Sequence, residues 1–312
     1  MNQLSKLNDV VFKRFAKYDY AIVNVKNIIP PEEDASTLFI SAGMQLWKQQ
    51  FAAKTRAKVA TLQTCIRLND LELVGDGSHL TSFEMLGNFS FGNSDYGESV
   101  QMWDAILIDL ELKKDCIIHV HEGMTNHLLH WLKLGYPVKY DESCHWTDGG
   151  ALGGFCSEVY WKGLELGNLV NTLGHSTDVG FGWERLLQVL EGKDRVDETE
   201  LFRQGIHPIC ADHYRTIQRF FDHGIKPGNK GREYVCRRLI RRALKVESND
   251  TVLIKTLPST LWDDFMEERE RREKSLKNAK RALKDHIDKS DEWWWDTFGV
   301  LPEELLVLKD NV

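Results

Sequence analysis

The hydrophobic pattern of the chain changes near residue 200, and this change limits the folds that it can adopt. Before it, short β-branched or aromatic runs alternate with turns, as expected for strands, at 21–25, 37–40, 59–67, 81–89 and 116–120. After it, strand signals vanish, and helical spacing occupies 207–222, 231–245 and 258–289. The last stretch carries mixed charges at every turn, which predicts a solvated helix or helical hairpin arm. We therefore expect an α+β domain at residues 1–200 followed by an all-helical domain at 201–312.

Composition excludes several classes of protein. The 312 residues are 42% hydrophobic and 10% aromatic, too apolar for a disordered chain, and no run approaches the roughly 20 apolar residues of a membrane span. Leu4, Leu7, Val11 and Phe15 alternate with polar residues, which predicts an amphipathic N-terminal helix rather than a signal peptide. Six cysteines without a CxxC pair indicate reduced thiols, so a cytoplasmic protein without membrane contact is expected.

The sharpest local pattern is a glycine-rich strand that runs into an apolar helix. Asp178, Gly180 and Gly182 alternate along the strand, and Glu184 and Arg185 begin the helix. Alternate glycines let a strand approach a ligand closely. An arginine at the start of the helix offers a planar, permanently charged fork for phosphate. The pattern also fits a plain strand–helix turn with a surface Glu–Arg pair, so taken alone it leaves both interpretations open.

A second pattern combines an arginine with an aromatic strand. Arg67 ends one strand, and after a polar loop His79 leads into a strand that contains Phe83, Phe89 and Phe91. This combination suits a nucleotide, because a guanidinium can bind phosphate while a ring stacks on the base. An ordinary hairpin with core phenylalanines is the alternative.

In their order along the chain, the two patterns resemble motifs 2 and 3 of class II aminoacyl-tRNA synthetases. Their residues resemble specifically those of the alanyl-tRNA synthetase family. Residues 83–92, FEMLGNFSFG, match that family's motif 2 strand almost letter for letter. Further similar segments are the motif 1 segment TLFISAGM at 37–44 and the helical tRNA-recognition region at 211–213, 237–243 and 295–299. The likeness runs from residue 1 to about 305. It implies a class II antiparallel sheet flanked by helices, followed by an all-helical domain.

The resemblance implies that ATP binds bent on the sheet surface together with Mg²⁺. Arg67 and Arg185 fall on the motif 2 and motif 3 arginines and would be the catalytic residues, because phosphoryl chemistry needs charge stabilisation more than covalent help. Phe83 falls on the ring that stacks on adenine. Glu158 is a candidate Mg²⁺ ligand. The implied ATP-binding residues are Arg67, His79, Phe83, Asn168 and Arg185.

The resemblance also implies an alanine pocket on the same sheet. Asp178 falls on the aspartate that pairs with the alanine ammonium, and Gly180 falls on the glycine beside the substrate methyl group. Trp146 and Val170 match walls of the pocket. The sequence departs from the family where apolar residues are replaced by Asn171 and Thr172. The loop at 68–72 is short, as in archaeal forms, and the stretch 147–158 lacks the usual proline.

Positive charge concentrates in the predicted helical domain. Residues 226–246 contain eight Lys/Arg and one Glu, a local charge of +7 in a chain of net −7. Arginines four positions apart line one helix face, Glu233 is the one acidic residue of the segment, and a phosphate-tracking surface is expected. By the resemblance, Asn229 and Asp296 read the acceptor stem of tRNA(Ala) from its minor groove. The predicted tRNA-binding residues are Asn229, Arg232, Arg237, Arg238, Arg241, Arg242 and Asp296.

Histidines and cysteines do not form a recognisable metal motif. Cys116 lies near several histidines and Cys210 lies near His213, but neither group has a second CxxC or HxxxH pair to complete four ligands. We therefore expect no protein zinc site, with Mg²⁺ entering alongside the ATP substrate.

The function implied by the resemblance is that of an alanine–tRNA ligase. It would activate alanine with ATP and transfer it to the 3′ end of tRNA(Ala), as a monomer without the family's editing and C-terminal domains. One alternative is an adenylate-forming ligase that charges a carrier protein or a small molecule, which the short loop at 68–72 would suit. Another is a non-catalytic regulator or RNA-binding relic. The basic helix argues against the first, and the retained Arg67, Phe83, Asp178 and Arg185 argue against the second.

Overall fold

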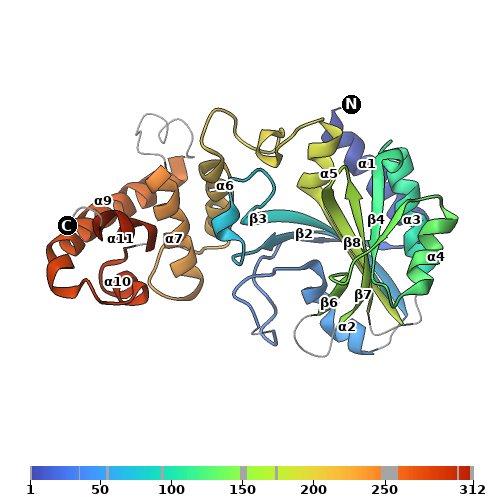
Figure 1. The fold of residues 1–312 in the computed structure, drawn as a ribbon, viewed down its shortest axis with the longest axis horizontal. Coiled ribbons are helices and arrows are strands. Elements are labelled where there is room, and N and C mark those ends of the chain that lie inside the picture. Colours follow the sequence, from blue (N-terminus) through green and yellow to red (C-terminus); the bar gives the residue numbers. More distant parts are fainter. Residues whose placement is uncertain are drawn as a thin grey trace. The chain divides into compact units, whose positions relative to one another are not determined.

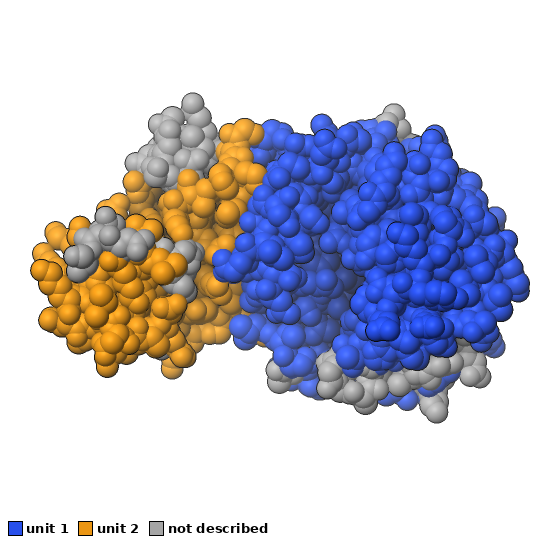
Figure 2. All heavy atoms as spheres, in the orientation of Figure 1, with its two compact units in different colours: residues 1–204 blue, residues 205–312 orange. Residues whose placement is uncertain are grey.

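The computed structural model describes residues 2–34, 36–53, 56–92, 95–147, 153–172, 175–246, 259–300 and 302–309. The chain divides into two compact units, residues 1–204 and residues 205–312, which Figure 2 colours blue and orange. Residues 1–204 form unit 1, and residues 205–312 form unit 2. None of the helices in the described ranges combines the length and the apolar character needed to cross a membrane.

A single large sheet organises unit 1 (Figure 1). Its order is β1-β2-β3-β9-β8-β7-β4-β5, and β6 pairs with β7 beside this path. The strands are β1 (Ala21–Val25), β2 (Ala57–Ile66), β3 (Ser82–Phe91), β4 (Cys116–Val120), β5 (Val138–Tyr140), β6 (His145–Thr147), β7 (Gly153–Trp161), β8 (Leu164–Thr172) and β9 (Ser176–Gly182). The six central strands pair antiparallel, as predicted. The pairs β1–β2 and β4–β5 are parallel, so the complete sheet is mixed.

Helices of unit 1 pack on one face of this sheet. They are α1 (Gln3–Lys17), α3 (Tyr96–Asp109), α4 (Thr125–Lys133) and α5 (Trp183–Leu190), while the short α2 (Lys48–Ala53) follows a 3₁₀ turn. The predicted N-terminal helix is confirmed, and its apolar stripe of Leu7, Val11 and Phe15 is fully buried in the main core. On the opposite face, Phe51 of α2 packs against Phe89 and Phe91 of β3, and the rest of that face can form a site.

Strand β9 shows how the two faces are divided. Val179 and Phe181 point into the main core, where the Phe181 ring stacks on Trp103 with 3.5 Å between centroids. Because side chains alternate along a strand, Asp178 and Gly180 lie on the other face. The same pairing register that seats the core residues thus places the predicted substrate residues together on one surface.

All the regular secondary structure in the described residues of unit 2 is helical, as the sequence predicts. Its helices are α6 (Pro208–Asp222), α7 (Gly231–Val246), α9 (Ser259–His286), α10 (Asp291–Phe298) and α11 (Pro302–Lys309). The expectation that α9 is solvated is wrong for one of its faces. Leu261, Phe265 and Glu268 are buried there, and Ala279 and Leu283 pack with Trp294 of α10.

Most predicted elements of the chain form close to their expected positions. The run 37–40 is an exception, because it is irregular rather than a strand. The short β5, β6, α10 and α11 were not predicted. The assignment of 1–200 and 201–312 as separate functional domains stays a prediction.

Candidate functional site

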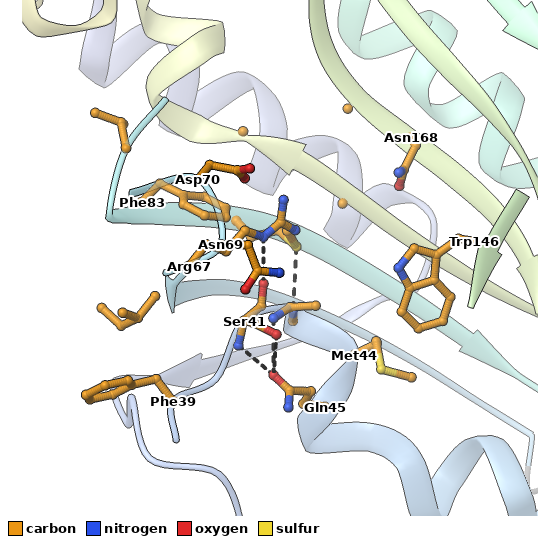
Figure 3. A pocket seen from close by; sticks show the side chains of 18 of the residues that line it. Phe39, Ser41, Met44, Gln45, Arg67, Asn69, Asp70, Phe83, Trp146 and Asn168 are labelled. Carbon is orange, nitrogen blue, oxygen red and sulfur yellow. Dashed lines mark hydrogen bonds between the residues drawn. The ribbon is translucent and has the colours of Figure 1, made fainter. Parts of the chain in front are cut away.

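A large cavity lies on the sheet surface of unit 1 and has a volume of about 860 Å³. Strands β3, β8 and β9 and the segment around 36–48 contribute to its lining. Figure 3 shows Arg67 and Phe83 toward one end, with Trp146 and Asn168 toward the other. All nine residues that were predicted to bind ATP or the amino acid line it: Arg67, His79, Phe83, Trp146, Asn168, Val170, Asp178, Gly180 and Arg185.

Arg67 and Phe83 form the first part of the site. Arg67 follows β2, and its Nε donates a hydrogen bond to the Ser41 carbonyl oxygen at 3.0 Å. Its guanidinium carbon lies 5.0 Å from the centroid of the Phe83 ring, which the β2–β3 pairing positions opposite Cys65. No described residue hydrogen-bonds the terminal nitrogens of Arg67. The side chain therefore presents a fixed positive charge beside an aromatic face.

Arg185 enters the cavity from the first turn of α5. Its Nη1 donates to the backbone oxygen of Glu165 at 2.8 Å and to the Glu165 carboxylate at 3.1 Å. The backbone N–H of Glu84 donates to both carboxylate oxygens of the neighbouring Glu184, at 3.1 Å to Oε1 and 2.9 Å to Oε2. This contact ties the start of α5 to β3 and fixes the position of Arg185.

His79 is oriented by an aspartate in its own loop. Its Nδ1 lies 2.6 Å from Asp76 Oδ2, and Asp76 Oδ1 accepts the backbone N–H of His79 at 2.9 Å. No described residue bonds to the Nε2 atom. The second ring nitrogen is thus available to a ligand of the cavity.

Asp178 has the most unusual environment of the site. Only 9% of it is exposed, and burial raises the pKa of its carboxyl group to about 7. Within the described residues, no cation or hydrogen-bond donor pairs with this carboxylate. A buried carboxylate without a partner is costly in its ionised form. The cavity therefore favours a ligand that carries a positive charge.

Small and apolar groups surround Asp178. Asp178 and Gly180 lie directly opposite Val170 and Asn168 on β8. A Cβ atom at Gly180 would lie 2.9 Å from Met85 Sδ, so a side chain there would crowd Met85. Trp146 packs with Val170 in a small apolar cluster at the same end. The space beside Asp178 is therefore suited to a short, apolar substituent.

Glu158, the candidate Mg²⁺ ligand, is not among the residues that line the cavity. Tyr160 donates a hydrogen bond to its Oε2 at 3.1 Å, and Cys156 Sγ lies 4.0 Å from its Oε1. Burial, followed by the charge of Glu165, raises the pKa of this carboxyl group. Its role as a Mg²⁺ ligand stays a prediction.

The arginines of α7 in unit 2 have surroundings that the sequence did not indicate. Glu268 of α9, itself 1% exposed, accepts from Arg237 Nε at 3.1 Å and from Arg241 Nε at 2.6 Å. Arg241 also donates to the Gly299 carbonyl oxygen. The expectation of an unneutralised basic face is therefore wrong for Arg237 and Arg241, because an acidic residue from another helix pairs with both.

The remaining predicted tRNA-binding residues differ in exposure. Arg242 is buried, whereas Arg232 and Arg238 are partly exposed. Asn229 is exposed, and its Oδ1 accepts a hydrogen bond from Arg237 Nη1. The side chain of Asp296 lies outside the described residues. Their contact with tRNA stays a prediction.

Comparison with known proteins decides the family. The family model of tRNA synthetases class II (A) matches residues 10–168 and 166–299. The chain belongs to this family. The matched residues include strands β1–β9 of unit 1 and helices α6, α7, α9 and α10 of unit 2.

Curated relatives within this synthetase family carry the name alanine–tRNA ligase. The protein from Neorickettsia sennetsu is 31% identical over 78% of this chain and 37% of its own length. The protein from Desulfitobacterium hafniense is 30% identical over 77% of this chain and 35% of its own length. The mitochondrial one from Dictyostelium discoideum is 33% identical over 69% and 31%. This chain thus spans about a third of the length of the relatives that it matches.

Solved synthetase structures also resemble the chain. A pyrrolysyl tRNA synthetase from Desulfitobacterium hafniense is 15% identical with a TM-score of 0.43, covering 63% of this chain and 72% of that one. An aspartyl tRNA synthetase from Entamoeba histolytica is 12% identical with a TM-score of 0.42, covering 62% and 55%.

Several residues of the synthetase cavity were missed by sequence reasoning. Ser41 anchors Arg67, Glu165 pairs with Arg185, and Glu184 holds α5 against β3. The position of Glu184 directly before Arg185 was a usable signal for the last of these. Ser41 lies in the segment 37–44 that resembles motif 1, but the pattern does not reveal that its backbone oxygen accepts from Arg67. No local pattern marks Glu165, because it meets Arg185 only when the distant parts of the chain come together.

Proposed function

We propose that this chain activates alanine with ATP to form alanyl-adenylate and transfers the alanyl group to the 3′ end of tRNA(Ala). Asp178 carries the proposal: it is a buried carboxylate without a described cation, in the cavity that also contains Arg67 and Arg185. A ligand that brings its own positive charge would stabilise the ionised form of Asp178. An amino-acid ammonium is such a ligand, and arginines suit its carboxylate and the phosphates of ATP.

The chemistry requires charge stabilisation more than a covalent catalyst. A carboxylate oxygen of alanine attacks the α-phosphorus of ATP, the bond from that phosphorus to the bridging oxygen breaks, and pyrophosphate leaves. Negative charge grows on the phosphate oxygens, and Arg67 and Arg185 would neutralise it without reorganising. Phe83 offers its ring to adenine. Mg²⁺ would shield the phosphate charges, and the Glu165 carboxylate in the cavity lining, of which Oε2 accepts from Arg185, has a second oxygen that could hold the ion.

The choice of alanine follows from the space beside Asp178. Gly180, Val170 and Trp146 leave room for a short apolar group, and Met85 limits how far the room extends. Such a pocket distinguishes substrates that differ by one methylene by about 1–3 kcal/mol. We therefore expect alanine as the preferred substrate, with detectable activation of glycine or serine.

Unit 2 would supply the RNA contacts. Asn229 is exposed, and Arg237 occupies its carbonyl oxygen, which leaves the amide NH₂ group as a donor toward acceptors in the shallow minor groove of RNA. Arg232 and Arg238, which are partly exposed, would contact backbone phosphates. The alanine–tRNA ligase relatives, which align with most of this chain, support a tRNA acceptor rather than a carrier protein.

Amino-acid-dependent exchange of pyrophosphate into ATP tests the activation step, and charging of tRNA(Ala) with labelled alanine tests the transfer. Alanine should give the fastest exchange. Arg185→Ala should lower the exchange rate by about 10²–10³, as for the loss of one charge-stabilising donor. The matched control is Arg203→Ala, because Arg203 is exposed and does not line the cavity. Pyrophosphate exchange without charging of tRNA would show that the alanyl group goes to a different acceptor. A lack of exchange with every amino acid tested would refute the proposal.

A further inference from the structure

Two cysteines and a glutamate converge behind the wall of the cavity. The Sγ atoms of Cys144 and Cys156 and a carboxylate oxygen of Glu158 all lie within 4.8 Å of one another. Cys144 is 0% exposed and Cys156 is 2% exposed. They face each other where β7 pairs with the segment leading into β6, and the Cys156 N–H donates to the Cys144 carbonyl oxygen at 3.0 Å. The backbone pairing of the two segments thus fixes the two thiols close to each other.

We propose that Cys144, Cys156 and Glu158 bind one thiophilic divalent cation of the zinc class. Zinc–sulfur bonds of about 2.3 Å in tetrahedral geometry separate two thiolates by about 3.8 Å. The Sγ–Oε1 distance of 4.0 Å between Cys156 and Glu158, and the 4.8 Å limit for the whole group, need only a small contraction to reach this geometry. Two sulfur ligands select zinc over the Mg²⁺ that accompanies ATP. A water molecule would complete the coordination.

The surroundings of Glu158 support a metal ligand rather than a chance neighbour. The Tyr160 hydroxyl donates to Oε2 at 3.1 Å, which leaves Oε1 directed at Cys156. The Tyr160 ring stacks on His119 at 4.2 Å, and His119 Nδ1 lies 3.1 Å from Asp141 Oδ2. Hydrogen bonds of this kind orient the ligands of protein metal sites. A disulfide between the two cysteines would use neither Glu158 nor this network.

The position of the ion gives it a structural role next to the substrate. Cys156 lies directly opposite Val170 on β8, and Val170 lies directly opposite Asp178 on β9. Cys144, Cys156 and Val170 form one buried cluster with Trp146 packed against it. A bound ion would link the start of β6 to β7 and so hold Trp146 and Val170 in place.

Cobalt is a suitable probe, because thiolate ligation of Co²⁺ produces charge-transfer absorption in the near ultraviolet. The reduced full chain, stripped with a chelator, is titrated with Co²⁺ in the absence of ATP. We expect saturation at a single ion, loss of the band in Cys144→Ser and Cys156→Ser, and 10–100-fold weaker binding in Tyr160→Phe. Cys116→Ser is the matched control, because Cys116 is equally buried in β4 and belongs to no such group among the described residues.

A measurement on the unmodified protein removes the risk that a variant misfolds. X-ray absorption of the zinc-loaded wild-type chain should show two sulfur ligands at about 2.3 Å and oxygen ligands at about 2.0–2.2 Å. No charge-transfer band in the wild type, a band that survives both cysteine substitutions, equal loss in Cys116→Ser, or a shell without sulfur would each overturn the proposal.

Discussion

Two buried carboxylates, one in each unit, have opposite surroundings. Glu268 in unit 2 is 1% exposed and pairs with Arg237 and Arg241. Asp178 in unit 1 is 9% exposed and has no described cation beside it, although it lies in a cavity with arginines at other points of its lining. A carboxylate neutralised within its own chain contributes to folding, whereas one left without a partner is ready for a charged ligand. Burial alone therefore does not distinguish a structural carboxylate from a ligand-binding one, whereas the presence or absence of a paired cation does.

The largest effect should come from Glu268→Gln. The substitution leaves two arginines, of which Arg241 is buried, without their carboxylate, and breaking a buried ion pair costs about 3–5 kcal/mol. The free energy of unfolding from urea titration measures the loss. Glu267→Gln is the matched control: Glu267 is 62% exposed, pairs with Arg271 on the same helix, and should cost less than about 1 kcal/mol. Equal costs for the two variants would contradict the structural role of Glu268.

Asp178→Asn should lower activity without lowering stability, in contrast to Glu268→Gln. It removes the partner of the proposed ammonium group, and we expect alanine-dependent pyrophosphate exchange to fall by about 10²–10³. The stability of the ligand-free chain at pH 7.5 should stay the same or rise, because an unpaired buried charge has been removed. Asp9→Asn, on the exposed side of α1, is the control and should change neither quantity. A destabilised variant with normal exchange would reverse the roles assigned to the two carboxylates.

The raised pKa of the Asp178 carboxyl group should also make the free energy of unfolding depend on pH. Asp178 has a pKa of about 7 in the folded chain and an ordinary pKa near 3.8 when unfolded. The folded state then binds the proton more tightly, so Asp178 favours folding at low pH and this contribution declines as pH rises toward 7. Between pH 5 and pH 7, wild type should lose about 2 kcal/mol relative to Asp178→Asn. Parallel pH profiles for the two proteins would show that the carboxyl group has an ordinary pKa.

The smallest effect is expected at Phe83. Replacing its ring with leucine keeps an apolar contact but removes stacking on adenine, worth about 0.5–1.5 kcal/mol. The KM for ATP in the exchange reaction should rise about 2- to 10-fold, while the KM for alanine stays constant. A change confined to the KM for alanine would place adenine elsewhere in the cavity.

These contrasts also explain what the sequence could predict. Phe83, Asp178 and Arg185 lie in short, ordered motifs, so their presence in one cavity could be expected before the structure. The pairing of Arg241 could not, because Glu268 is 27 residues away on a helix whose mixed charges predicted a solvated surface. Cys144 and Cys156 were missed for the same reason: strand pairing across a connecting segment brings them together, and their spacing matches no metal motif. Residues in short motifs could be predicted from the sequence, whereas the partners of charged and sulfur-containing groups depended on tertiary contacts.

The alternation along β9 has a consequence for engineering and evolution of the substrate range. Odd-numbered positions, Val179 and Phe181, are committed to the core, and even-numbered positions, Asp178 and Gly180, face the cavity. An insertion or deletion of one residue in this strand would move the core residues to the cavity face and the cavity residues to the core face. The length of the strand therefore constrains both sets together. Point substitutions at even positions alter the cavity without disturbing the core, but a side chain at Gly180 requires Met85 to move, and Asp178 is needed for the proposed ammonium contact. A library that aims at altered specificity should therefore keep Asp178 and the length of the strand fixed, and vary Gly180 together with Met85.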